Sequence, residues 1–95
     1  MLFRSKALLR AVASLPCQLC GKEGETQAAH ANWTEYGKGM GMKAHDVYSA
    51  ALCVRCHDKI DQGSKLSYEE RKSLWEAAWR KTMLVLFEDG LVVTK

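Results

Sequence analysis

Cys17-Gln-Leu-Cys20 and Cys53-Val-Arg-Cys56 are two copies of the pattern Cys-x-x-Cys, separated by residues 21–52, which are 32 in number. Two residues between cysteines allow a tight turn to direct both thiolates at one ion, and zinc prefers four ligands in a tetrahedron. The two pairs use every cysteine of the chain, so no odd thiol remains. The spacing therefore predicts one structural zinc ion per chain, with a longer insert between the pairs than in common zinc ribbons.

The same cysteines have two other interpretations. They could remain free thiols or form two disulfides, although a reducing compartment disfavours disulfides. The run Cys53-Val-Arg-Cys56-His57 also matches the pattern Cys-x-x-Cys-His of covalent haem attachment. Haem attachment normally implies export and would leave the first cysteine pair without a role, so we expect no haem.

The bulk composition is that of a small globular domain. The chain has 95 residues, and we place a single domain at residues 1–95. A chain this short buries only roughly 60–65% of its unfolded surface, so a bound zinc ion would supply stability that the core lacks. The net charge of +3 permits nucleic acid as a partner without requiring it. No apolar run approaches the roughly 18 residues of a membrane span, so we expect no membrane association.

The N-terminal segment is basic. Residues 1–22 contain no acidic residue and carry Arg4, Lys6 and Arg10, each of which by itself is most simply a solubilising charge. Arg10 interrupts the short apolar run, so we expect a basic helix over residues 1–14 rather than a targeting signal. The expected location is therefore the cytoplasm.

Residues 15–65 are predicted to form the zinc-binding core. Residues 26–33 should be extended, and the Gly- and Lys-rich residues 34–46 should form a flexible loop. The apolar residues 47–52 lead into the second cysteine pair. A helix from about Cys56 to Gln62 should follow, with Gly63 as its C-terminal cap.

Residues 67–95 are predicted to add a helix and a short strand. Ser67 and Glu70 form the capping-box pattern Ser-x-x-Glu, which indicates a helix from Tyr68 to about Val85. Residues 89–94 indicate a turn and a small terminal strand. The expected apolar face of the helix comprises Leu74, Trp75, Ala78 and Trp79.

Taken together, the motifs resemble the HNH, or ββα-metal (His-Me finger), endonucleases, and in particular the small prophage-encoded nucleases of that superfamily. The resemblance covers about residues 15–65 and uses the cysteine pairs, Ala29-His30, the glycine- and lysine-rich run at 37–43, and the segment Cys56-His-Asp-Lys-Ile-Asp61. It implies an α+β fold: a small zinc-stapled ββα-metal domain with flanking N-terminal and C-terminal helices and a short terminal strand.

The resemblance also implies a function, namely metal-dependent hydrolysis of phosphodiester bonds in DNA during phage recombination or DNA processing. It implies that this takes place in a bacterial or phage-infected cell. His30 would be the general base, His57 a ligand of a catalytic Mg²⁺ or Mn²⁺, and Asp46 the residue that braces the loop or orients the base. Many members carry Asp or His immediately before the base, whereas this chain has Ala29. Asp61 is then a candidate metal ligand, because it lies four residues after His57 on one helix face.

This chemistry agrees with the residue types. A neutral imidazole with a pKa of about 6.5 suits a general base near neutral pH, and a divalent ion stabilises the charge that develops on the phosphate. Lys38, Lys43 and Arg55 are the expected phosphate contacts. No base-reading motif is visible, so we expect weak sequence preference. The alternative, which Ala29 favours, is a non-catalytic zinc-finger module that binds nucleic acid or a protein.

Overall fold

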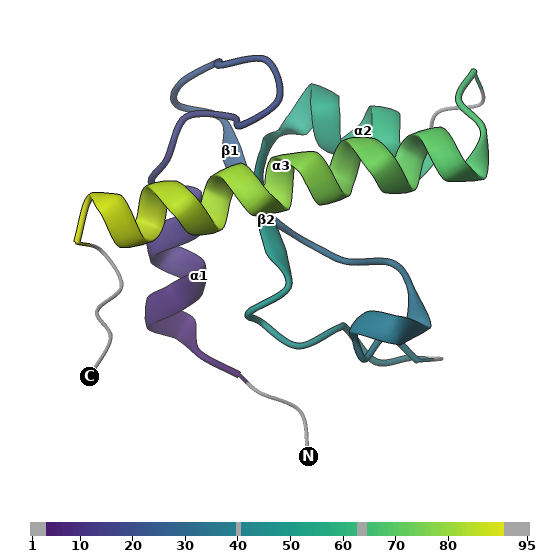
Figure 1. Ribbon diagram of the computed structural model, residues 1–95, viewed down its shortest axis with the longest axis horizontal. Coiled ribbons are helices and arrows are strands. Elements are labelled where there is room, and N and C mark those ends of the chain that lie inside the picture. The colour runs from purple at the N-terminus through teal and green to yellow at the C-terminus, as the bar shows by residue number, and fades with distance from the viewer. Residues whose placement is uncertain (1–3, 40, 63–64, 91–95) are drawn as a thin grey trace.

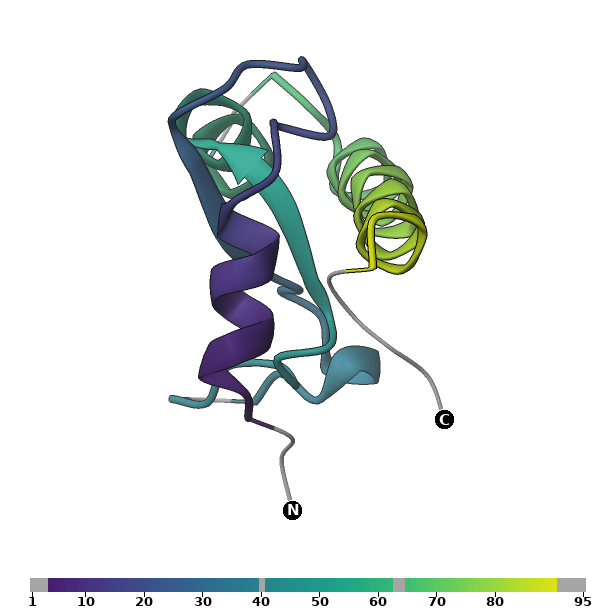
Figure 2. The same cartoon turned by 90° about the vertical axis from the view of Figure 1, so that its left-hand side faces the viewer.

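The computed structural model describes residues 4–39, 41–62 and 65–90. Its elements in chain order are α1 (Lys6–Ala13), β1 (Thr26–His30), the 3₁₀ turn η1 (Thr34–Tyr36), β2 (Ser49–Cys53), α2 (Val54–Gln62) and α3 (Tyr68–Glu88). The long helix α3 runs across the two strands (Figure 1). The view turned by 90° shows the strands between α1 and α3 (Figure 2). The predicted α+β class is therefore confirmed.

The two strands form an antiparallel sheet in which Thr26 pairs with Cys53, Ala28 with Ala51 and His30 with Ser49. All five residues of β2 are buried, because helices cover both faces of this strand. Successive side chains of a strand point to opposite faces. Ala28 accordingly packs with the α1 residues, whereas its neighbour Ala29 belongs to the cluster around α3. His30 follows the face of Ala28.

Helix α3 begins where the capping box predicts. The Ser67 hydroxyl accepts from the backbone N–H of Glu70 at 3.1 Å, and the Glu70 carboxylate accepts from the Ser67 N–H at 2.9 Å. The helix continues to Glu88, three residues beyond the expected end at Val85. Leu86 is fully buried in a cluster with Val12 of α1, and this packing explains the extra length.

Two predicted helix starts are wrong. Helix α1 begins only at Lys6, because the Ser5 hydroxyl caps it by accepting from the Leu8 N–H at 3.1 Å. Helix α2 begins at Val54, two residues before the predicted start at Cys56. The expected cap at Gly63 and the expected strand at residues 91–94 lie outside the described residues.

The predicted flexible loop over residues 34–46 is a packed segment over much of its length. Its first residues form η1, and the Tyr36 ring lies among those of Trp75, Tyr48 and Trp79. The Tyr36 hydroxyl also donates to Glu76 of α3. Glycine content predicted mobility, but the aromatic side chain anchors the segment to α3.

Among the described elements, no helix combines the length and the apolar character that crossing a membrane requires.

Candidate functional site

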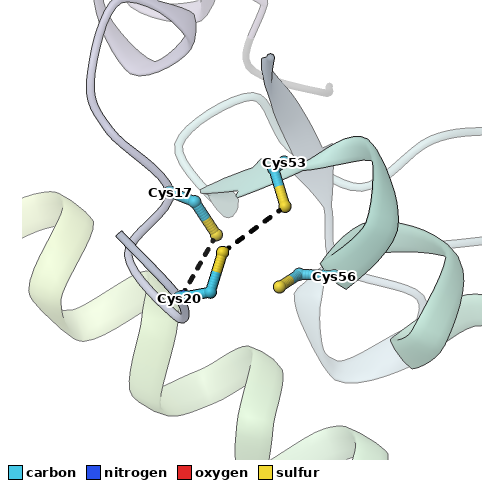
Figure 3. Close-up of side chains that lie close together, drawn as sticks. All are labelled: Cys17, Cys20, Cys53 and Cys56. Carbon is cyan, nitrogen blue, oxygen red and sulfur yellow. Dashed lines mark hydrogen bonds between the residues drawn. The ribbon is translucent and has the colours of Figure 1, made fainter. Parts of the chain in front are cut away.

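The four cysteines meet at one point, as their spacing predicts. Cys17 and Cys20 lie in the turn before β1, Cys53 ends β2, and Cys56 lies in the first turn of α2 (Figure 3). Their sulfur atoms all lie within 4.8 Å of one another, and those of Cys20 and Cys53 are 3.6 Å apart. A zinc tetrahedron with Zn–S bonds of about 2.3 Å has S–S edges of about 3.8 Å. The four thiols are free, and the cluster has the donors of a structural metal site such as one for zinc.

The electrostatics of this cluster also favour a cation. Burial by itself raises the pKa of Cys17, but backbone N–H groups of Cys20, Cys53 and Leu19 outweigh it and lower that pKa to about 6. Burial and the three neighbouring thiols raise the pKa of Cys56 instead. Several thiolates at this distance repel one another unless a positive ion lies between them. A cation between the sulfur atoms would offset this repulsion and favour the thiolate form that binds metal.

His30, the last residue of β1, is held by one ring nitrogen. Its Nε2 atom lies 2.8 Å from Oδ1 of Asp46, which is 3% exposed. The other carboxylate oxygen accepts from the Ser5 backbone N–H at 2.6 Å, and Nη1 of Arg4 lies 3.2 Å from Oδ1. Asp46 therefore orients the imidazole of His30 and leaves Nδ1 for other contacts.

His57 and Asp61 form a second pair on α2. Nε2 of His57 lies 3.0 Å from Oδ2 of Asp61, and Nδ1 lies 2.7 Å from Oε1 of Gln27. The hydrogen bond to Asp61 raises the pKa of His57, although burial opposes it. The Asn32 amide reaches the other Asp61 oxygen at 3.4 Å. The predicted i, i+4 geometry is present and offers a metal ion one imidazole and one carboxylate.

A single pocket of about 240 Å³ brings most of the predicted site residues together. Its lining includes His30, His57, Asp61, Lys38 and Lys43. Two histidines, a carboxylate and two ammonium groups therefore face one volume. The arrangement can hold an anion beside two imidazoles.

Two residues predicted for this site do not line the pocket. Asp46 contacts His30 from outside the lining, and the side chain of Arg55 is exposed on α2, also outside it. Ala29 is 1% exposed, and its carbonyl accepts from Nε1 of Trp75 at 2.9 Å. Within the described residues, the four cysteines form the one group of three or more His, Cys, Asp or Glu side chains close enough to share an ion.

Four residues of the site were not predicted from the sequence. Arg4 and Ser5 contact Asp46, while Gln27 and Asn32 contact His57 and Asp61. Ser5 and Asp46 are 41 residues apart, so no local pattern links them. The alternation of β1 does not indicate Gln27 or Asn32, because Gln27 alternates with the face of Ala29 rather than that of His30 and Asn32 follows the end of the strand.

Asp46→Asn is expected to destabilise the protein by about 1–3 kcal/mol at pH 7, because it weakens three buried or half-buried contacts. Burial would raise the pKa of Asp46, but His30, the Ser5 N–H and Arg4 together hold it below its usual value. The contribution of this carboxylate is therefore present above the unfolded pKa of about 3.9 and is lost as the pH falls through the lower folded pKa.

Urea unfolding of both proteins between pH 7 and pH 3 measures this effect, and the difference should shrink below about pH 4. Asp89→Asn, which alters an exposed aspartate, is the control and should change stability by less than about 0.5 kcal/mol. A pH-independent difference for Asp46→Asn would contradict the assignment.

Comparison with known families shows to which family the chain belongs. A family model described as "Protein of unknown function (DUF968)" matches residues 1–87, from before α1 to the last turn of α3. The chain belongs to the DUF968 family. No curated protein and no solved structure matches it. The DUF968 match includes α1 and α3, so both flanking helices belong to the unit that this family shares with the chain.

Proposed function

We propose that this chain is a small zinc-stapled endonuclease of the HNH type that hydrolyses phosphodiester bonds of DNA with a divalent metal ion. The observation that carries the proposal is the pocket shared by His30, His57 and Asp61 with Lys38 and Lys43. Phosphodiester hydrolysis needs a base for water, positive charge for the phosphate and a way to stabilise the leaving oxygen. Groups of all three kinds line this pocket.

His30 would take the proton from the attacking water through Nδ1, since Nε2 is held by Asp46 at 2.8 Å. The carboxylate of Asp46 would stabilise the imidazolium that forms, as a buried acid does for a general base in hydrolases. Arg4 and the Ser5 N–H keep Asp46 in place. This chain of contacts supports the role of orienting the base for Asp46.

His57 and Asp61 would hold the catalytic Mg²⁺ or Mn²⁺, replacing their mutual contact of 3.0 Å by contacts to the ion. Magnesium commonly takes only one or two protein ligands and completes its shell with water and phosphate oxygens. A bound divalent ion would supply positive charge for the phosphate and the leaving oxygen. Lys38 and Lys43 would position the phosphate on the other side of the pocket.

The zinc ion would have a structural task in this scheme. It would tie the turn before β1 to the junction of β2 and α2, where the four cysteines lie. Because His30 ends β1 and His57 lies in α2, that connection would keep base and metal ligand on facing elements. The order strand, strand, helix is also the order that the resemblance to HNH nucleases implies, and it supports the proposal.

His30→Ala is expected to lower the rate of plasmid nicking with Mg²⁺ or Mn²⁺ by about 10²–10⁴-fold, because general base catalysis contributes that much. The assay follows conversion of supercoiled plasmid to the nicked form, with zinc content and circular dichroism as checks on folding. The control is His45→Ala, which removes a histidine outside the pocket lining. Nicking that persists at the wild-type rate in His30→Ala would refute the role of His30.

A non-catalytic zinc-binding module that binds DNA or a protein is the second candidate. Ala29 favours it, since alanine offers no ligand atom and, among the described residues of the pocket lining, His57 and Asp61 are then the candidate metal ligands besides His30. DNA binding without cleavage under Mg²⁺, Mn²⁺ or Zn²⁺ would select this function over the nuclease.

A further inference from the structure

A second pocket adjoins the first on the side of α1. Its volume is about 510 Å³, and Arg4, Lys6 and Lys43 contribute cationic side chains to its lining. His30 and Lys43 line both pockets. The hollow that begins between β1 and α2 therefore continues past the candidate base toward the start of α1.

The charges of this second pocket are unbalanced. Its one carboxylate, Asp46, is engaged by His30, Arg4 and the Ser5 N–H. Lys6 is exposed and, like Lys43, has no acidic partner among the described residues. Two ammonium groups that are 37 positions apart in sequence thus face one hollow without a counter-charge. This placement favours an anion.

We propose that the second pocket binds the backbone phosphate next to the scissile one, with Lys6 as its main contact. The inference rests on the proposed nuclease function and deepens it. Because His30 and Lys43 lie at the boundary of the two pockets, the scissile phosphate would lie there, and the strand would continue toward α1. The substrate is then a polynucleotide with its scissile phosphate at the boundary and the next phosphate in the second pocket. A small diester has one phosphate and does not reach the second pocket.

Phosphate contacts of this kind position the strand without reading its sequence. Each lysine that neutralises a phosphate releases counterions. For duplex DNA, the loss of one such contact therefore makes the plot of log binding constant against log salt concentration less steep by about 0.9. A lysine that serves only solubility does not change this slope. The salt dependence therefore separates a phosphate contact from a surface charge.

The test compares Lys6→Gln with Lys81→Gln. Lys81 is exposed on α3, and this helix lies on the other side of the strands from α1 (Figure 2). Its replacement changes the net charge equally. Affinity for a labelled DNA duplex is measured by fluorescence anisotropy from 50 to 200 mM salt without added divalent ion. We expect Lys6→Gln to weaken binding about fivefold to tenfold at 0.1 M salt and to lower the slope by about 0.9. Lys81→Gln should leave the slope unchanged, and Lys6→Arg, which keeps the positive charge, should have the wild-type slope.

Hydrolysis supplies a second measurement on the same variants. Lys6→Gln should slow plasmid nicking but leave hydrolysis of bis(4-nitrophenyl) phosphate, which has one phosphate, at the wild-type rate. Equal salt slopes for Lys6→Gln and Lys81→Gln, or equal losses on both substrates, would overturn the subsite. If the wild-type protein cleaves neither substrate, the nuclease function fails, and the salt slopes still decide whether Lys6 contacts a phosphate.

Discussion

A strong zinc chelator is expected to unfold this protein cooperatively, and readdition of zinc should refold it. Structural zinc contributes an apparent free energy of about 10–16 kcal/mol in zinc-finger peptides, which is as large as the whole stability of a typical domain at about 5–15 kcal/mol. Here the cysteine cluster joins the turn before β1, the end of β2 and the start of α2. Far-UV circular dichroism with a colorimetric zinc assay measures both events together.

Cys20 offers a matched pair of variants for the same prediction. It is exposed, so Cys20→Ala removes a candidate zinc ligand without leaving a cavity in the core. Cys20→His keeps a ligand, and three cysteines with one histidine form a common structural zinc site. We expect Cys20→Ala to lose zinc and much of its helical signal, whereas Cys20→His should retain both. A folded Cys20→Ala protein with unchanged melting temperature would show that the cluster is not a zinc site.

Trp75→Ala is expected to lower the free energy of unfolding by about 3–5 kcal/mol, the usual cost of removing a buried aromatic side chain. Trp75 is 1% exposed, and its Nε1 atom donates to the Ala29 carbonyl at 2.9 Å. Its ring packs against those of Trp33, Tyr36 and Trp79, with centroids 5.6, 5.3 and 6.0 Å away. The substitution would therefore open the centre of the core and release β1 from α3.

Two further variants separate the contribution of the Trp75 hydrogen bond from that of its buried ring. Trp75→Phe keeps much of the ring but loses the hydrogen bond, so we expect a loss of about 1–3 kcal/mol. Phe87→Ala removes an aromatic ring that is 47% exposed on the same helix and should cost less than Trp75→Phe. Urea unfolding in the presence of zinc measures all three. Equal losses for Trp75→Ala and Phe87→Ala would contradict the core that the structure shows.

The contact between Trp75 and Ala29 also bears on the site. Ala29 immediately precedes His30, and its carbonyl is the atom that the indole of Trp75 holds. A buried hydrogen bond at this point restricts the end of β1, where the candidate base lies. The contact of Trp75 with Ala29 therefore helps to position His30 from the core, on the opposite face of the strand from the pocket.

Short spacings in the chain were sufficient to predict several local features. The two Cys-x-x-Cys turns predict converging thiols, and the four sulfur atoms do lie within 4.8 Å of one another. The capping box at Ser67 predicts the start of α3 correctly. The four-residue spacing of His57 and Asp61 predicts their contact on α2. The helix cap and the His57–Asp61 contact depend on backbone geometry within about one turn, which neighbouring residues determine. The meeting of the two cysteine pairs joins distant segments, and it was predicted because four thiolates match one tetrahedral ion.

Apart from the cysteine cluster, contacts between distant segments could not be predicted from the spacing of residues. The resemblance suggested that Asp46 orients the base, but the Arg4 and Ser5 contacts that hold Asp46 come from a segment about 40 residues away. The glycine-rich composition of residues 34–46 predicted a flexible loop, whereas Tyr36 packs into the aromatic cluster on α3. Packing in three dimensions decides which side chain fills that cluster. The spacing of residues along the chain does not predict it.

The cysteine pairs, the helix cap and the His57–Asp61 pair are thus determined by the sequence itself, because local spacing and hydrogen bonding define them. The shared pocket is decided by tertiary structure. The sheet must lie between α1 and α3 before His30, the two lysines of the loop and Lys6 of α1 can surround one hollow. The physical reason is that burial of β2 on both faces, rather than any motif, brings α1 next to the candidate base.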